Sequence, residues 1–142
     1  MPPVWLIGFL ALSWWLGGLT GSMGFASWVG WVAIALIAAA VAIFAVAVLE
    51  FRRVKTTIIP REAPSALITS GIFSRSRNPI YLADTLLLAG LIVKWDALLA
   101  VPLIPAFVWI IQSRFIKGEE AGLDAAFPSD FAAYKSRTRR WI

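Results

Sequence analysis

Four long hydrophobic runs alternate with polar segments along this chain of 142 residues. The second run holds 22 residues without a charge, and a helix needs roughly 17 to 25 apolar residues to cross a bilayer. The other runs are short but usable, and the last two can tilt or stop short of the far surface. The pattern predicts an all-α integral membrane protein, a single membrane domain with four transmembrane helices. The predicted spans are residues 4–19, 28–49, 79–93 and 97–111.

The third and fourth runs predict a C-terminal helical hairpin, because only Lys94, Trp95 and Asp96 separate them. Pro102 and Pro105 should kink its second arm.

Small residues add two details to this pattern. Ala38, Ala42 and Ala45 recur at helical spacing in the second run, which predicts a face for close packing against another helix. Four glycines between residues 17 and 24 predict a flexible turn after the first run.

The tail, residues 112–142, has an amphipathic pattern. Leu123 and Phe127 are four residues apart, which suits a helix, and Pro128 should interrupt it. Phe131 and Tyr134 predict a further helical turn that lies on the protein or on the bilayer. The tail ends in arginines and a tryptophan, which suit an anionic lipid surface.

Charge predicts the orientation in the membrane. With 60% hydrophobic residues and a mean hydropathy of +0.79, the chain is too apolar for an ordinary soluble domain. Of its 13 Lys and Arg residues, 12 lie in the loop 50–78 or in the tail, and only Lys94 lies elsewhere. The positive-inside rule therefore predicts that this loop, the tail and both termini are cytoplasmic. Basic residues beside apolar spans also account for the net charge of +5 without a nucleic-acid partner.

The chain contains no Cys and no His. Their absence excludes disulfides and thiolate nucleophiles, and it removes the commonest general base and the commonest metal ligand. We therefore expect no metal site. Any chemistry must use Asp, Glu, Tyr, Lys, Arg, the backbone or a cofactor.

The end of the predicted loop is polar, basic and turn-forming, with Gly71 suited to a turn and Pro79 suited to a helix start. Tyr81 and Asp84 follow three residues apart, so they share one helical face near the membrane edge. An ionisable group at this depth normally faces the protein interior or a wet cavity. For Asp84 two interpretations stay equally open. Either it faces the protein interior or a cavity in a functional role, or it reaches to the interface or caps a neighbouring helix.

Several short motifs occur in order around the hairpin. They read Leu-Ile-Thr-Ser-Gly-Ile-Phe at 67–73, Arg-Asn-Pro-Ile-Tyr at 77–81, Arg114 followed by the pair Glu119-Glu120, and Phe-Pro-Ser-Asp-Phe-Ala-Ala-Tyr at 127–134. Together they resemble the signature of the integral-membrane methyltransferase family that contains isoprenylcysteine carboxyl methyltransferases and phospholipid N-methyltransferases. The resemblance covers roughly the C-terminal 85 residues. Asn78 stands where the family usually has His, Phe73 where Tyr is common, and Pro128 where Gly is common.

The resemblance implies an S-adenosylmethionine pocket at the cytoplasmic membrane face, built from the loop and the tail. The implied cofactor-binding residues are Ser65, Ala66, Leu67, Ile68, Phe73, Asn78, Pro79, Ile80, Tyr81 and Glu119, and side-chain chemistry adds Arg77 and Glu120 as candidates. It places Arg114 against the substrate, and we add Tyr81 and Asp84 as catalytic candidates. For this pocket to form, residues 78–81 and Glu119 must share one chamber.

The chemistry of these residue types fits that cofactor. A glutamate can pair with its ammonium, Arg77 or backbone N–H groups with its carboxylate, and Phe73 or Tyr81 can stack on adenine. Methyl transfer needs alignment and a dry site more than acid–base groups, so an enzyme without His or Cys can perform it. An amine acceptor would need a base, which Asp84, Glu119 or Tyr81 would supply.

The expected function is thus methyl transfer from S-adenosylmethionine to a lipophilic or lipidated acceptor, with S-adenosylhomocysteine as product. The acceptor is a carboxylate, an amine or a thiol, and the isoprenylcysteine-carboxyl type is most similar. The alternative is a non-enzymatic membrane subunit or scaffold that binds anionic lipid or a partner through its basic loops. Membrane lipids are partners in both cases, and the sequence does not set the oligomeric state.

Overall fold

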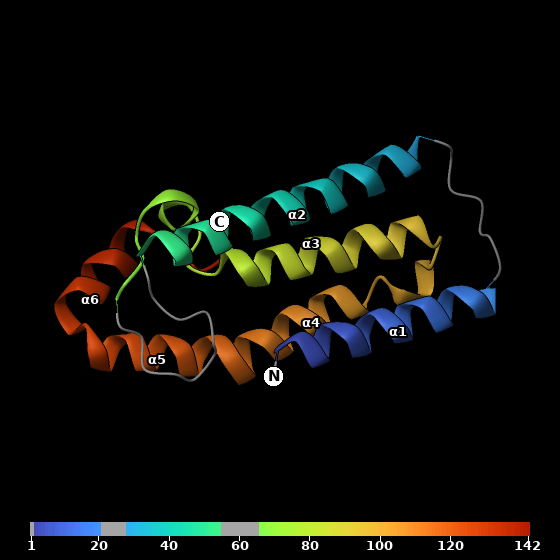
Figure 1. Cartoon of the computed structure of the whole chain (residues 1–142). Coiled ribbons are helices and arrows are strands. Elements are labelled where there is room, and N and C mark those ends of the chain that lie inside the picture. The colour runs from blue at the N-terminus through green and yellow to red at the C-terminus, as the bar shows by residue number, and fades with distance from the viewer. Residues whose placement is uncertain (1, 21–27, 55–65) are drawn as a thin grey trace.

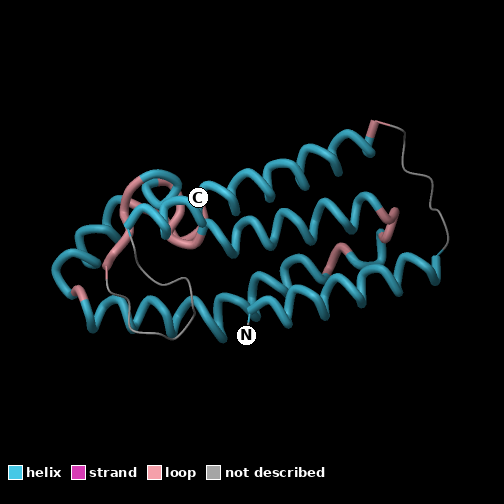
Figure 2. Tube along the Cα trace, in the orientation of Figure 1, coloured by secondary structure: helices cyan, strands magenta, loops and turns pink. Residues whose placement is uncertain are grey.

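The computed structural model describes residues 2–20, 28–54 and 66–142. These residues form helices joined by turns and short loops, and none of them is in a strand (Figure 2). The prediction of an all-α chain is therefore confirmed.

The helices follow one another along the chain, with α4, η3 and α5 continuous as one long helix. In order they are α1 (Pro2–Thr20), α2 (Val29–Val54), the 3₁₀ turn η1 (Gly71–Ser74), α3 (Pro79–Lys94), the 3₁₀ turn η2 (Leu98–Ala100), α4 (Leu103–Ile111), the π-helical segment η3 (Gln112–Ile116), α5 (Lys117–Ala126) and α6 (Pro128–Arg137).

The long helices run alternately in opposite directions, with α2 beside α3 and α1 beside α4 (Figure 1). The segment 66–78, the start of α3, α5 and α6 lie at one end of the molecule. The turn after α3 lies at the other end (Figure 1). The two polar segments that flank the predicted hairpin are therefore at the same end, as the sequence indicates.

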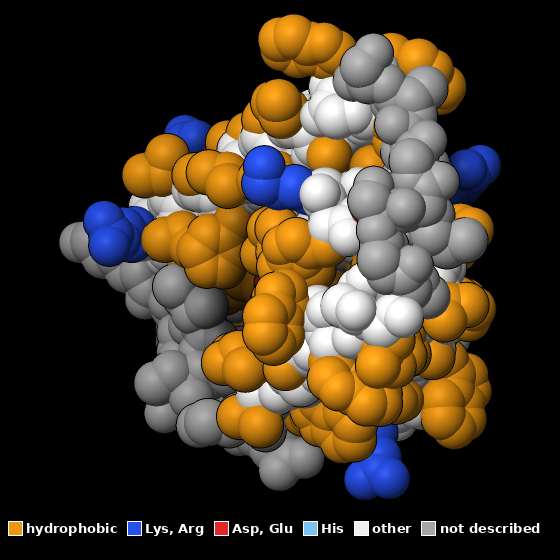
Figure 3. Space-filling view, turned by 90° about the vertical axis from the view of Figure 1, so that its right-hand side faces the viewer, with side chains coloured by type: hydrophobic (Ala, Val, Ile, Leu, Met, Phe, Trp, Pro, Cys, Tyr) orange, Lys and Arg blue, Asp and Glu red, His pale blue; other side chains and the backbone are white. Residues whose placement is uncertain are grey.

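Within the described ranges, three helical stretches are long and apolar enough to cross a membrane, namely Pro2–Leu19, Val29–Val54 and Leu98–Ala126. The 16-residue α3 is not among them, so the count of four spans stays a prediction. Large apolar side chains are exposed along α1 and α2, and hydrophobic side chains predominate in the end-on view (Figure 3). An apolar exterior of this extent identifies an integral membrane protein.

The contact between α2 and α3 depends on small residues. A Cβ built on Gly90 would lie 2.8 Å from Ile37 Cγ1 and 3.2 Å from the carbonyl oxygen of Ala33, so only glycine permits this approach. Ala33, Ala40 and Ala47 are buried at a seven-residue spacing. A seven-residue repeat keeps one helix face on its partner, as in left-handed helix packing.

The packing face predicted at Ala38, Ala42 and Ala45 is wrong, because all three alanines are exposed. The second hydrophobic run is apolar on every side, so its periodicity does not tell the buried face from the face turned to lipid. The helix also extends beyond the predicted span of residues 28–49, since α2 continues to Val54.

Only part of the predicted glycine turn after the first run lies within the described residues. Gly17 and Gly18 lie inside α1, which corrects that prediction, and Gly21 and Gly24 lie outside the described residues. Gly17 is buried, and a Cβ built there would lie 3.1 Å from Ala97 Cβ. It lets α1 pack closely on the turn after α3.

The predicted hairpin is present, with its turn after Lys94. Its second arm starts as η2, and the regular helix α4 begins only after Pro102. Pro105 lies in the first turn of α4, where a missing N–H group costs nothing. The prolines therefore interrupt the arm before α4 instead of kinking it.

One hydrophobic core joins α1, α3 and α4, and the rings of Phe9 and Phe107 meet edge to face at 5.3 Å inside it. A second cluster, Ala47, Ile68 and Phe73, fixes the segment 66–74 on α2. In the tail, the helix is interrupted before Pro128 as predicted, since α5 ends at Ala126 and α6 begins at Pro128. Phe131 and Tyr134 are buried against the protein.

Candidate active site

The loop before α3 is held against the end of α2. The ring of Phe73 is buried and meets Phe51 edge to face at 5.5 Å. Ser70 Oγ donates a hydrogen bond of 3.1 Å to the Glu50 carboxylate. Gly71 has a φ of +56°, a conformation that favours glycine, and it lies directly against the Glu50 side chain. The loop is thereby placed at the entry of α3.

Helix α6 is attached to the same loop by a buried hydrogen bond. The hydroxyl of Tyr134 donates to the Phe73 carbonyl oxygen at 2.5 Å. Burial raises the pKa of Tyr134 to about 12, which keeps the hydroxyl protonated and able to donate.

The two motifs on either side of the hairpin meet in one contact. Tyr81 Oη, on the first turn of α3, donates a hydrogen bond of 2.7 Å to Glu119 Oε1 on α5. The Tyr81 residue is only 6% exposed. The requirement that residues 78–81 and Glu119 lie close enough to share a chamber is therefore met.

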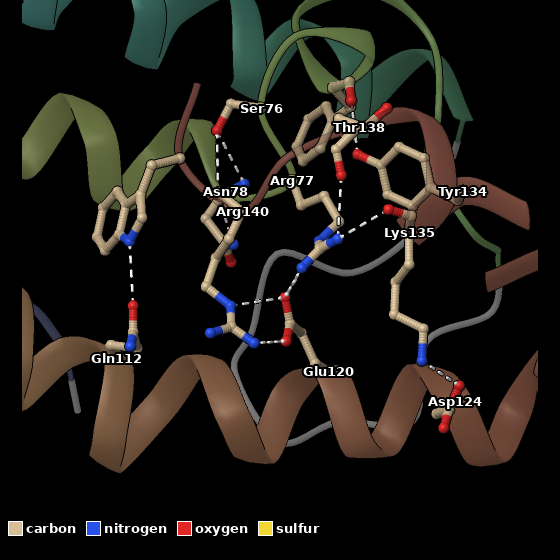
Figure 4. Close-up of polar contacts among 12 residues, drawn as sticks. Ser76, Arg77, Asn78, Gln112, Glu120, Asp124, Tyr134, Lys135, Thr138 and Arg140 are labelled. Carbon is tan, nitrogen blue, oxygen red and sulfur yellow. Dashed lines mark hydrogen bonds and ion pairs between the residues drawn. The ribbon is translucent and has the colours of Figure 1, made fainter. Parts of the chain in front are cut away.

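The neighbouring residue Glu120 is paired inside the protein (Figure 4). Arg77 contacts its carboxylate through Nε and Nη2, at 3.1 and 2.9 Å, and Arg140 does so at 3.1 and 2.5 Å. We call Arg77, Glu120 and Arg140 the arginine clamp. Arg77 and Glu120, both predicted cofactor ligands, are thus engaged with each other. Arg140 carries no sequence signal that separates it from the other tail arginines.

The C-terminal segment 138–141 lies across the start of α3. The backbone N–H of Arg77 donates to the Arg139 carbonyl at 3.0 Å, and Asn78 Nδ2 donates to the Arg140 carbonyl at 3.0 Å. Trp141 Nε1 donates to Gln112 Oε1 at 3.1 Å (Figure 4). Arg140 and Trp141 therefore bind the protein, which corrects the expectation that they serve a lipid surface.

The π-helical segment η3 was not indicated by any sequence pattern. It lies where the long helix leaves its apolar part, and Phe115 and Ile116 are buried while Arg114 is exposed. The Arg114 guanidinium lies 5.9 Å from the ring centre of Trp5 on α1. Single π turns are rare and recur at functional sites.

Asp84 lies one turn below Tyr81 on α3. It is half-buried on the face that also carries the buried Tyr81 and Leu88, and that face packs toward α1 and α4. Within the described part of the chain, its carboxylate forms no hydrogen bond and no ion pair. A carboxylate placed in this way can pair with a cationic group of a ligand.

The remaining predicted cofactor residues occupy different places. Pro79 is buried and Ile80 half-buried at the start of α3, Ile68 and Phe73 pack on α2, and Ser65 lies outside the described residues. An open hollow of about 580 Å³ lies beside Ala66 and Leu67 but does not reach Tyr81 or Glu119. Its lining consists of Ala66, Leu67, Thr69, Phe127, Asp130, Ala133 and Arg137.

One family model matches the chain, that of Phospholipid methyltransferase, over residues 28–130. The matched part runs from α2 to the start of α6 and ends before the C-terminal segment that carries Arg140. No curated protein and no solved structure matches the chain significantly. Because the family model covers well over half of the chain and the helices are apolar, the chain belongs to the phospholipid methyltransferase family and is a membrane methyltransferase.

Proposed function

We propose that this chain transfers a methyl group from S-adenosylmethionine to a lipophilic acceptor, in a site at the cytoplasmic membrane surface. The observation that carries the proposal is the 2.7 Å hydrogen bond between Tyr81 and Glu119. It joins the two motifs across the hairpin at one end of the molecule, as a shared cofactor chamber requires. Family membership supplies the reaction class.

The residues around the Tyr81–Glu119 contact fit the cofactor chemically. Glu119 offers a carboxylate for an ammonium group, and charge-assisted hydrogen bonds are about twice as strong as neutral ones. The Tyr81 hydroxyl orients the Glu119 carboxylate. The segment 66–69 lines a separate open hollow at the same end of the molecule (Figure 1).

Bound S-adenosylmethionine would supply an electrophilic methyl group to this site. The protein has to align the acceptor with that group and to keep water away, since methyl transfer is an in-line displacement. The aliphatic side chains of α3 and α4 suit the exclusion of water. Asp84 is the group we propose to take the proton that an amine acceptor must lose.

The charges around the Tyr81–Glu119 contact favour an amine acceptor over a carboxylate acceptor. Asp84 brings negative charge there in addition to the glutamate assigned to the cofactor, whereas Arg77 and Arg140 are both turned to Glu120. A carboxylate would be repelled, and an amine would be attracted. Arg114 is exposed and is available for a lipid phosphate. We therefore propose an aminophospholipid as acceptor, in place of the isoprenylcysteine type.

Isothermal titration with S-adenosylhomocysteine tests cofactor use. Detergent-purified protein that unfolds cooperatively should bind it at one site. A folded sample that does not bind would overturn the proposed function and favour the scaffold alternative.

A second experiment tests the acceptor. Protein in vesicles is given S-adenosylmethionine with a labelled methyl group, and lipids are separated afterwards. Vesicles with phosphatidylethanolamine should gain label, while vesicles with phosphatidylcholine and an isoprenylated cysteine should not. Label on the isoprenylated cysteine alone would reverse the assignment of the acceptor.

A further inference from the structure

The C-terminal segment contributes to the site although the family match ends before it. We infer that the arginine clamp fixes the rotation of α5 so that Glu119 faces Tyr81, and that Arg140 is a positioning residue for the cofactor site. The inference rests on the proposed function, because it assigns Arg140 a role in cofactor binding that acts through Glu119.

Besides the clamp, helix α5 has the Tyr81–Glu119 hydrogen bond and a more exposed ion pair between Asp124 and Lys135 of α6. None of its residues is fully buried, so no hydrophobic contact of the usual strength fixes its orientation. It also follows directly on η3, where the π turn changes the helical register relative to α4. Phe115 and Ile116 of η3 are buried directly before α5, so core packing sets the approximate rotation of α5 and leaves the finer direction of its side chains to other contacts.

The clamp supplies the missing constraint. The side chains of Arg77 and Glu120 are 12% and 14% exposed, and that of Arg140 is 32% exposed. Ion pairs with this much burial and several hydrogen bonds have defined geometry, and breaking one leaves a charge without its partner. Glu119 and Glu120 are consecutive on one helix, so the rotation that seats Glu120 between two arginines also directs Glu119.

Arg140 is itself held in place through its backbone. Its carbonyl oxygen accepts hydrogen bonds from Asn78 Nδ2 at 3.0 Å and from Ser76 Oγ at 3.5 Å. The next residue, Trp141, is tied to Gln112. Asn78 thus has a defined task at the position where the family usually has His, since its amide secures the segment that carries Arg140.

A double-mutant cycle tests the inference. S-adenosylhomocysteine affinity is measured for wild type, Arg140→Ala, Glu119→Gln and the double variant. Arg140→Ala should weaken binding about tenfold in the wild-type background, as is typical of coupled groups in one network. In the Glu119→Gln background the same change should have almost no effect. Arg139→Ala removes the same charge from a neighbouring exposed side chain and should leave affinity within about twofold.

Two controls separate positioning from general stability. Arg140→Lys keeps the charge and should restore part of the lost affinity, and thermal unfolding in detergent identifies variants that do not fold. Equal losses from Arg140→Ala in both backgrounds, in folded protein, would overturn the inference while leaving the proposed function intact.

A readout without ligand keeps the inference testable if the cofactor does not bind. The chain has no cysteine, so Tyr81→Cys and Glu119→Cys introduce the only thiols. A short bifunctional thiol reagent should link them efficiently, and Arg140→Ala should lower the yield severalfold while Arg139→Ala does not. An unchanged yield would show that the clamp does not place residue 119.

Discussion

The membrane body and the polar end of this protein are held together in different ways. In the body, α2 and α3 approach through Gly90 and a row of buried alanines, and shape is the determining factor. At the polar end, α5 and the C-terminal segment are fixed by hydrogen bonds and ion pairs around Glu120. The contact between α2 and α3 tolerates no added volume at Gly90, whereas the polar end depends on matched charges.

This difference separates stability from function. The helices of the body carry no signature residue for the cofactor before the start of α3, yet they bring both motifs to one end. The polar end contains every candidate for chemistry. Substitutions in the body should therefore act on folding, and substitutions at the polar end should act mainly on binding and turnover.

The largest effect on folding is expected for Gly90→Val. The added side chain would meet the backbone of α2 at Ala33 and the side chain of Ile37, so the helices must separate. Overpacking of this kind costs about 3 kcal/mol. Thermal unfolding in detergent measures it, with Gly30→Val as matched control, because a Cβ there meets nothing. Equal destabilisation by both variants would contradict the packing argument.

A slightly smaller effect, confined to the polar end, is expected for Glu119→Gln. The amide oxygen can still accept the Tyr81 hydrogen bond, but the negative charge is lost. S-adenosylhomocysteine affinity should fall by about 2 kcal/mol, the usual strength of a charge-assisted contact, with little change in unfolding temperature. Titration and thermal unfolding on one preparation check both points. A large drop in stability without a change in affinity would place Glu119 among the structural residues.

The sequence predicts the apolar body well but not its internal faces. Uncharged runs longer than a bilayer crossing have few structural options, so the helix class follows from hydropathy alone. Which side of α2 packs inward does not follow. Ala38 and Ala40 are chemically identical, and which of them is buried depends on the face of α2 that the rest of the protein packs against.

The polar end is predictable only where local motifs exist. Tyr81 and Glu119 belong to short motifs in a fixed order, and their meeting could be expected from the hairpin between them. The arginine clamp could not, because it depends on the path of a C-terminal segment that contacts residues about sixty positions earlier. The π turn at η3 has no sequence pattern either, since it reflects the competition between core packing and helix geometry.

A moderate effect on the free energy of unfolding is expected for Tyr134→Phe, because Tyr134 holds α6 to the loop that packs on α2. The substitution leaves the buried Phe73 carbonyl without its donor, which costs about 1 to 2 kcal/mol. The pKa of Tyr134 is raised from 10.0 to about 12, so ionisation favours the unfolded state as pH rises through this range. The stability advantage of wild type over Tyr134→Phe should be constant below about pH 10 and shrink between pH 10 and 12. Denaturant unfolding at several pH values measures it, and a constant difference would contradict the assigned hydrogen bond.

The smallest effect on folding and cofactor affinity is expected for Arg114→Ala. Its guanidinium is exposed beside Trp5, and an exposed cation–π contact contributes only about 0.5 to 1 kcal/mol. Turnover on phospholipid vesicles should nevertheless fall several-fold, because the proposed phosphate partner of the acceptor is lost. Lys117→Ala removes the charge of another exposed residue on the same long helix and serves as control. If Arg114→Ala lowers S-adenosylhomocysteine affinity as much as it lowers turnover, Arg114 contacts the cofactor and not the acceptor.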